Sequence, residues 1–178
     1  SEKTTLVKYN DTWYYVKKGN IDWKATTVCK YKGTWYYVKN SQVDFNATKI
    51  VNYYGADYYI QKGVLRFGVN GLTYVNGTWY NLKNSAVVKN STPTLVPLDG
   101  TYYYVENGKI NFSATTLVKY GNAWYYVQKG VLRWGVETLV KYGNTWYYVK
   151  NSQVDFGANL RYKYYGTYYT VKNGVVRL

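Results

Sequence analysis

The sequence predicts an all-β protein, an elongated solenoid of eight stacked β-hairpin repeats of about 22 residues each. Three observations support this prediction. The string Thr-Trp-Tyr-Tyr-Val recurs at a nearly constant spacing, each copy contains two β-rich runs around a two-residue turn, and no segment shows a helical period. We therefore expect residues 1–178 to form a single repeat domain.

The repeats are defined by the column of residues that begins at Trp13. Its members are Trp13, Trp35, Asp57, Trp79, Tyr102, Trp124, Trp146 and Tyr168. Successive members are 22 residues apart, except for a step of 23 near Pro93 and Pro97, which mark an irregular junction. The repeats span approximately residues 4–25, 26–47, 48–69, 70–92, 93–114, 115–136, 137–158 and 159–178.

Each repeat is expected to begin with a tight hairpin. In the first repeat, residues 5–9 and 12–16 flank the turn Asn10-Asp11, a pair typical of two-residue hairpin turns. A second turn then leads to a short third strand, such as Val43–Phe45 in the second repeat. A hairpin of this size is not stable alone in water, so the repeats must pack on one another.

The two-residue turn also predicts which residues share a face of the hairpin. Face one carries Leu6, Lys8, Trp13 and Tyr15, and face two carries Val7, Tyr9, Tyr14 and Val16. The columns of Tyr14 and Val16 stay aromatic and aliphatic in all eight repeats, whereas three columns of face one admit polar residues. Because a buried core tolerates few unpaired polar groups, we expect face two to be the core and face one to be partly exposed.

The third strands are expected to stack in register. The residue before their aromatic position is Asp in some repeats and Arg in others, and three neighbouring repeat pairs set one against the other. This alternation predicts cross-strand ion pairs. The predicted pairs are Asp44–Arg66, Arg133–Asp155 and Asp155–Arg177.

Composition excludes several kinds of catalytic site. The chain has no His, so a Ser-His-Asp triad and an imidazole metal site are impossible, and its single cysteine, Cys29, is expected to be a small buried apolar residue. Its nine acidic residues are scattered, whereas glycoside hydrolysis needs two carboxylates about 5–10 Å apart. The sequence therefore predicts a protein that is not an enzyme and needs no metal or cofactor. It also contains no apolar run of about 18 residues, so no membrane span is expected.

The string Leu-Val-Lys-Tyr followed by Thr-Trp-Tyr-Tyr-Val-Lys resembles the aromatic repeats of Gram-positive surface proteins, namely the choline-binding and glucan-binding cell-wall modules. The resemblance extends from about Thr4 to Leu178 and is most specific in the Trp-Tyr-Tyr hairpin. It implies a hairpin solenoid that binds choline-bearing teichoic acids or α-glucans without catalysis. It also implies a secreted or cell-surface location, and because the sequence opens almost inside its first repeat, we expect a longer multidomain chain.

One column departs from the choline-binding pattern. That pattern places a Trp at the start of the first strand, where the ring helps to enclose choline. The matching column here is Leu6, Val28, Ile50, Leu72, Leu95, Leu117, Leu139 and Arg161. Since a quaternary ammonium group needs several aromatic faces around it, a glucan-binding or general polysaccharide-binding role transfers better.

We predict that the rings of face one stack on sugars, while nearby lysines contact hydroxyl or phosphate groups. Regular spacing of such weak platforms gives avidity for a repeating polymer. The predicted carbohydrate-binding residues are Trp13, Tyr15, Trp35, Tyr37, Trp79, Trp124, Tyr126, Trp146 and Tyr148, with Lys8, Lys30, Lys119 and Lys141.

Two questions about the partner stay open at the level of sequence. The net charge of +14 favours an anionic cell-wall polymer such as teichoic acid, while the glucan-binding resemblance favours a neutral α-glucan such as starch or dextran. Nucleic acid would suit a basic, aromatic surface too, but the sequence has no signature of a nucleic-acid-binding fold. The alternative of a different kind is a structural spacer with no ligand, in which every ring packs between repeats.

Overall fold

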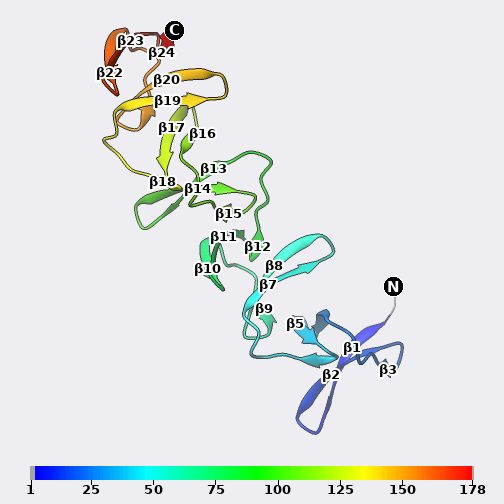
Figure 1. Ribbon diagram of the computed structural model, residues 1–178. Helices are drawn as coiled ribbons and strands as arrows, with labels where there is room; N and C mark the ends of the chain where they lie inside the picture. Colours follow the sequence, from blue (N-terminus) through cyan, green and yellow to red (C-terminus); the bar gives the residue numbers. More distant parts are fainter. Residues whose placement is uncertain (1–2, 178) are drawn as a thin grey trace. The chain divides into compact units, whose positions relative to one another are not determined.

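A computed structural model describes residues 3–177 as 24 β-strands with no helix, which confirms the all-β prediction. The outermost residues of the predicted domain, at positions 1, 2 and 178, lie outside this range. Each repeat contributes a hairpin of two longer strands and then a short third strand (Figure 1).

The chain divides into two compact units, Ser1–Val88 and Lys89–Leu178. In the first unit the hairpins are β1 (Thr4–Tyr9) with β2 (Thr12–Lys17), β4 (Thr27–Tyr31) with β5 (Thr34–Lys39), β7 (Lys49–Tyr53) with β8 (Ala56–Gln61), and β10 (Gly71–Val75) with β11 (Thr78–Lys83). Its third strands are β3 (Asn20–Ile21), β6 (Gln42–Val43), β9 (Val64–Leu65) and β12 (Ala86–Val87). The prediction that all eight repeats form one domain stays a prediction.

The second unit repeats this plan. Its hairpins are β13 (Thr94–Leu98) with β14 (Thr101–Glu106), β16 (Thr116–Tyr120) with β17 (Ala123–Gln128), β19 (Thr138–Tyr142) with β20 (Thr145–Lys150), and β22 (Leu160–Tyr164) with β23 (Thr167–Lys172). Its third strands are β15 (Lys109–Ile110), β18 (Val131–Leu132), β21 (Gln153–Val154) and β24 (Val175–Arg177).

The hairpin register agrees with the sequence-based prediction. In the first repeat the facing residues run from Tyr9 opposite Thr12 to Thr4 opposite Lys17. Asn10 and Asp11 have φ angles of 46° and 62°, as a type I′ turn requires. Because this turn forces the strands to pair directly on either side of it, every facing pair follows from the sequence.

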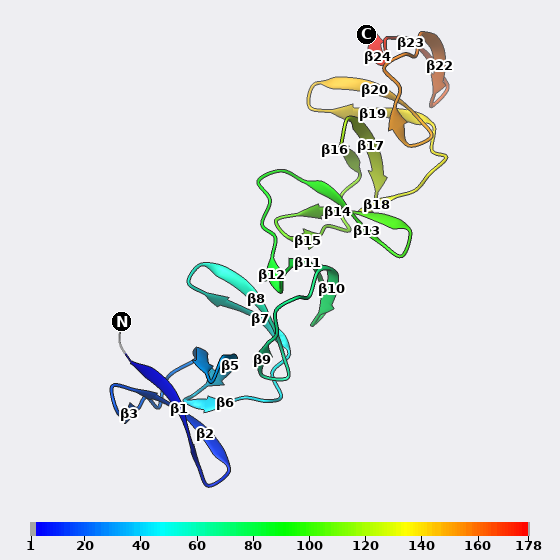
Figure 2. The same cartoon turned by 180° about the vertical axis from the view of Figure 1, so that it is seen from behind.

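Third strands join consecutive hairpins within each unit. Strand β6 pairs with β5 of its own repeat and also with β2 of the preceding repeat, beside which it lies in Figure 2. The same double pairing places β9 between β8 and β5, and β24 between β23 and β20. The hairpins therefore stack through short shared strands.

The predicted Asp–Arg ion pairs are wrong, because third strands pair with second strands and not with one another. In the described range, no ion pair joins Asp44 to Arg66 or Asp155 to either arginine. Instead, the carboxylate of Asp44 accepts a hydrogen bond from the backbone N–H of Asn46 at 3.0 Å, and Asp155 accepts one from Gly157 at 2.9 Å. These acids close Asx turns after the third strand.

The assignment of one core face and one exposed face is also wrong in part. The Val16 column of face two is buried as expected in every repeat except the first, and Val38, Ile60, Val127 and Val149 have no exposed surface. On face one, however, the Leu6 column is buried in most repeats, with Leu6 and Leu95 only 3% and 2% exposed.

The stacking of the repeats explains this result. One buried cluster combines Val28 and Tyr37 of repeat two with Ile60 and Leu65 of repeat three. Both faces of an internal hairpin therefore meet neighbouring repeats, and the core lies between successive hairpins. As predicted, Cys29 is buried in such a cluster.

Within each unit, the turn before the third strand is another close contact with the preceding repeat, as at Gly63, Gly130 and Gly174. A Cβ atom on Gly130 would lie only 2.5 Å from the carbonyl oxygen of Asn111, and Gly130 has a φ of +72°. Where serine occupies the same column, as Ser152 does, its hydroxyl is fully buried and donates a hydrogen bond to the carbonyl of Arg133. This turn therefore admits only small residues.

Candidate functional site

Aromatic rings from consecutive repeats meet at the hairpin tips. The Trp column lies just after the first turn and the Tyr9 column just before it, so stacking brings the Trp of one repeat to the Tyr of the next. The ring-centroid distances are 5.1 Å for Trp13–Tyr31, 5.5 Å for Trp35–Tyr53, 5.7 Å for Tyr102–Tyr120, 5.0 Å for Trp124–Tyr142 and 6.0 Å for Trp146–Tyr164. Such pairs stabilise by about 0.5–1.5 kcal/mol beyond the area they bury.

A third ring joins several of these pairs from the Tyr14 column. Tyr120 lies 6.5 Å from Tyr125, and Tyr164 lies 6.4 Å from Tyr169. We call the members of the Trp, Tyr9 and Tyr14 columns that meet at a junction between two repeats a ring cluster. Its three members come from two consecutive repeats of the same unit.

Two ring clusters enclose small hollows of about 100 Å³ each. They use the same columns of consecutive repeats. One is lined by Leu117, Trp124, Tyr142, Tyr147, Val154 and Phe156, and the other by Leu139, Trp146, Tyr164, Tyr169 and Val176. Tyrosine hydroxyls and one indole N–H are the polar side-chain groups among these lining residues, so each hollow suits a small apolar or cationic group.

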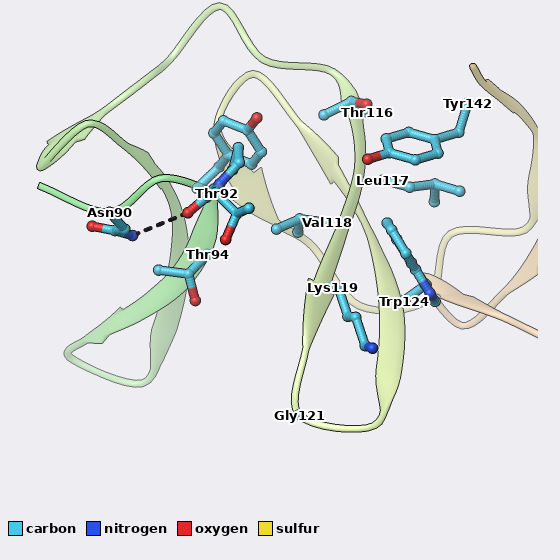
Figure 3. Close-up of a pocket in the computed structure, with 12 residues that line it drawn as sticks. Asn90, Thr92, Thr94, Thr116, Leu117, Val118, Lys119, Gly121, Trp124 and Tyr142 are labelled. Carbon is cyan, nitrogen blue, oxygen red and sulfur yellow. Dashed lines mark hydrogen bonds between the residues drawn. The ribbon is translucent and has the colours of Figure 1, made fainter.

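A larger groove of about 620 Å³ crosses the first strands of repeats five and six (Figure 3). Asn90 and Thr92 lie at one end, and Trp124 and Tyr142 lie at the other. Inside the groove, the Oδ1 atom of Asn90 is buried and has no hydrogen-bond partner among the described residues. Because Trp124 and Tyr142 also line a ring cluster, the groove adjoins that cluster.

The first unit has an equivalent groove of about 610 Å³. The two grooves are lined by nine common columns, and five of these columns carry the same residue type in both grooves. The identical residues are Tyr15 and Tyr104, Thr27 and Thr116, Lys30 and Lys119, Trp35 and Trp124, and Tyr53 and Tyr142. Each groove thus sets a lysine and a threonine hydroxyl beside an aromatic pair, which suits a chain that carries hydroxyl or anionic groups.

The predicted site residues divide into two groups. Trp13, Trp35, Trp124 and Trp146 all lie in the ring contacts between repeats, whereas Trp79 packs at 5.4 Å on Tyr74 of its own hairpin. Among the predicted lysines, Lys30 and Lys119 line the grooves, and the Nζ atom of Lys30 lies 5.9 Å from the Trp35 ring centroid. Lys8 pairs with Asp11 at 3.1 Å, and Lys141 is exposed.

The Tyr15 column is a correction to the prediction. Tyr37 and Tyr148 are 4% and 3% exposed, so their rings offer no face to a sugar. Tyr15 and Tyr126 are only partly exposed and pack against core clusters. These tyrosines fill the space between hairpins, whereas the sequence predicted exposed rings that stack on sugars.

The rings that the sequence argument missed are those of the Tyr9 column. Tyr31, Tyr53, Tyr142 and Tyr164 were expected to be core residues of face two, but each contacts a Trp of the preceding repeat. A signal was present, because tyrosine occupies this position beside the turn in most repeats. The partner ring lies 18 residues away in sequence and only the stack brings the two together.

Buried tyrosines have perturbed acid–base properties. Burial, followed by the neighbouring Glu137 carboxylate, raises the pKa of Tyr148, whose hydroxyl donates a hydrogen bond to Glu137 Oε1 at 2.5 Å. Burial is also the main cause that raises the pKa of Tyr53, Tyr104 and Tyr164. In each case the folded state favours the neutral phenol.

We expect the protein to lose stability at alkaline pH. Each folded-state pKa lies above the value of about 10 for a free tyrosine, so its contribution is complete below pH 10 and is lost as the pH rises through the folded value. Thermal melting between about pH 8 and pH 12 should show a melting temperature that falls above about pH 10. Tyr148→Phe, which cannot ionise at this position, should flatten the fall, and an equally steep fall would contradict the assignment.

A family model described as a choline-binding repeat matches residues 2–22, 24–44, 94–111, 113–133 and 135–155, which is more than half of the chain. The chain belongs to the choline-binding repeat family. The matched choline-binding repeats are the first, second, fifth, sixth and seventh. Among the others, the third has Asp57 in the Trp column and the eighth has Thr170 in the Tyr15 column.

Solved structures give similar matches for this choline-binding repeat chain. CbpJ from Streptococcus pneumoniae matches with 20% identity and a TM-score of 0.42, over 99% of this chain and 64% of that protein. Choline binding protein F from Streptococcus pneumoniae, crystallised with a peptidoglycan analogue, matches with 22% identity and a TM-score of 0.41, over 99% of this chain and 58% of that one. An alternansucrase in complex with isomaltotriose matches with 14% identity and a TM-score of 0.38, over 85% of this chain and 12% of that enzyme.

The chain thus spans about three fifths of the two pneumococcal proteins. A search of the curated proteins finds no match. Across the described residues there is no helix with the length and hydropathy needed to cross a bilayer.

Proposed function

We propose that this choline-binding repeat chain is a non-catalytic module that attaches to a choline-bearing polymer of a Gram-positive cell wall. The ring cluster is the observation that supports this function most directly, because the same columns enclose a hollow of about 100 Å³ at two successive junctions. Family membership supports a binding role of this kind. We place the protein outside the cell or on its surface, as part of a longer chain.

The chemistry of the hollow favours a quaternary ammonium group over a sugar ring. A trimethylammonium group needs aromatic faces and apolar contact and offers no hydrogen-bond donor. A hexose needs several hydrogen-bonding partners for its hydroxyls, and the cluster around Trp124 supplies only tyrosine hydroxyls and one indole N–H. Although Leu117 replaces an aromatic wall of the family pattern, Trp124, Tyr142 and Tyr147 still line the hollow.

The grooves suit the backbone of the same polymer. Lys30 and Lys119 place a cation beside the Trp–Tyr pairs, and Thr27 and Thr116 add hydroxyls, so a sugar or phosphate segment would find partners there. The net charge of +14 adds a general attraction to an anionic polymer. The hydroxyl-rich groove is also the observation that favours the second candidate, a neutral α-glucan such as starch or dextran.

Affinity electrophoresis distinguishes these ligands. The wild-type chain should be retarded in a gel that contains choline-bearing teichoic acid, and free choline should release it. Retardation by starch or dextran alone, insensitive to choline, would favour the glucan-binding function. A chain that no polymer retards would be a structural spacer. A partial loss of retardation at high salt is expected, because part of the attraction is ionic.

A further inference from the structure

A second set of aromatic rings lies just after the third strands. It comprises Trp23, Phe45, Phe67, Phe112, Trp134 and Phe156, whose exposed fractions range from 49% for Phe45 to 64% for Trp23. Exposed rings at one position in so many repeats are unusual, because a soluble protein gains nothing from leaving large apolar groups in water. The column therefore needs an explanation other than core packing.

These rings are held in a fixed setting by the Tyr14 column. Centroid distances within the repeat are 5.9 Å for Tyr14–Trp23, 6.3 Å for Tyr36–Phe45, 6.4 Å for Tyr103–Phe112, 5.9 Å for Tyr125–Trp134 and 6.3 Å for Tyr147–Phe156, each with an edge-to-face geometry. The tyrosine supports one side of the ring. About half of the ring surface stays accessible.

Two hollows place such a ring opposite the Trp of the preceding repeat. Phe156 lines the hollow of about 100 Å³ together with Trp124 and Tyr142. Phe67 lines a hollow of about 470 Å³ together with Trp35 and Tyr36. In the second case β9 pairs with β5, and Leu65 lies opposite Trp35. Phe67, two residues after Leu65, therefore lies near the same tryptophan.

At one junction, all three columns lose their rings. At the junction of repeats three and four the tryptophan is replaced by Asp57, its tyrosine partner by Val75 and the third-strand ring by Lys89. The supporting tyrosine of this repeat, Tyr80, is retained. If the third-strand ring served only to pack on that tyrosine, its loss here would be unexpected. Joint loss is expected if the three columns serve one ligand.

We infer that Phe45, Phe67, Trp134 and Phe156 are ligand-binding residues, each forming the outer wall of the ring cluster shared with the preceding repeat. This inference rests on the proposed function and assigns the missing aromatic wall of the choline site to the end of the third strand. The first-strand position that is aliphatic in this chain then forms the floor of the site. A cation held there is surrounded by four rings from two repeats.

The test replaces the four walls by leucine in the full chain, as Phe45→Leu, Phe67→Leu, Trp134→Leu and Phe156→Leu combined. Leucine keeps an apolar side chain but removes the π face, so the melting temperature should stay near that of the wild type. Isothermal titration with choline chloride should show an affinity about two- to fivefold weaker at each affected site, the effect of losing one exposed cation–π wall. Replacing the three phenylalanines by tryptophan should keep the affinity, since Trp134 already occupies this column.

Phe112→Leu is the matched control. Phe112 has the same exposed setting and the same edge-to-face tyrosine, but Leu98 occupies the Tyr9 column of its repeat, so the tyrosine of a ring cluster is missing there and the substitution should leave choline affinity unchanged. If Trp124→Ala weakens choline binding while the fourfold leucine variant binds like the wild type, the inference is overturned and the proposed function stands. If the wild type does not bind choline, the proposed function fails and the inference with it.

Discussion

Tyr148→Ala is expected to lower the free energy of unfolding of the second unit by about 3–5 kcal/mol, the range for truncating a large buried aromatic side chain. The side chain is 3% exposed and belongs to a cluster with Leu139, Val171 and Val176. Its ring lies 5.2 Å from that of Tyr162. Truncation would leave a cavity between two hairpins and remove the donor to Glu137.

The neighbouring residue supplies the control. Tyr147 is only partly buried and packs edge-to-face on the exposed Phe156 at 6.3 Å, so Tyr147→Ala should cost about 1–2 kcal/mol. Chemical denaturation of both variants measures the difference. In a stack of repeats the damage should be greatest in the adjacent repeats, which local hydrogen exchange would show. A larger loss from Tyr147→Ala would reverse the burial order and restore the face assignment made from the sequence.

The hairpins could be predicted from the sequence because their information is local. A two-residue turn such as Asn10-Asp11 fixes the register of the residues on either side, and all facing pairs of the first repeat follow from it. The third strands were harder to place. Their second partner belongs to the preceding repeat, as β6 with β2 shows, and no local pattern identifies it.

The Asp–Arg alternation in the third strands gave a misleading signal. It suggested that neighbouring third strands pair with one another. Instead, the carboxylates of Asp44 and Asp155 accept hydrogen bonds from the backbone N–H two residues later, within their own turns. Asp and Asn serve this purpose equally well, and Asn111 caps the same turn by accepting from Ser113 at 2.9 Å. The aspartates and the asparagine of this column are therefore explained by local turn chemistry.

The face assignment failed for a related reason. Polar residues in the Tyr15 column, namely Asn81 and Thr170, made that column look exposed. Both belong to repeats four and eight, which are the last repeats of their units. Inside a unit, the same column is covered by the next hairpin, as Tyr37 shows. Averaging a column over all repeats concealed this difference between internal and terminal repeats.

The tryptophans were predicted as site residues because they are frequent and amphipathic, and each now has a defined neighbourhood between repeats. Their tyrosine partners and the third-strand rings could not be assigned from one hairpin alone. A site assembled from two repeats becomes visible only when the stacking offset is known. For this reason the sequence predicted the tryptophan column of the proposed site and missed Tyr142 and Phe156, which line the same hollow as Trp124.

Removing the tryptophans should have the largest effect on binding. In the variant with Trp13→Ala, Trp35→Ala, Trp124→Ala and Trp146→Ala combined, we expect retardation by choline-bearing teichoic acid to fall by about 100-fold or more. Each site loses a cation–π wall worth about 0.5–2 kcal/mol, and several weakened sites on one polymer multiply the loss of avidity. Trp79→Ala is the matched control, because its ring contacts Tyr74 of the same hairpin.

Stability must be measured on the same samples, since each of these tryptophans also packs on a tyrosine of the next repeat. A moderate fall in melting temperature with the fold retained, together with lost retardation, would agree with a ring cluster that binds and packs. If the fourfold variant stays folded and is retarded as strongly as the wild type, the ligand does not use the ring clusters. If the variant unfolds and the wild type is retarded by no polymer, the rings serve only to join the repeats, because packing alone then accounts for every aromatic contact between them.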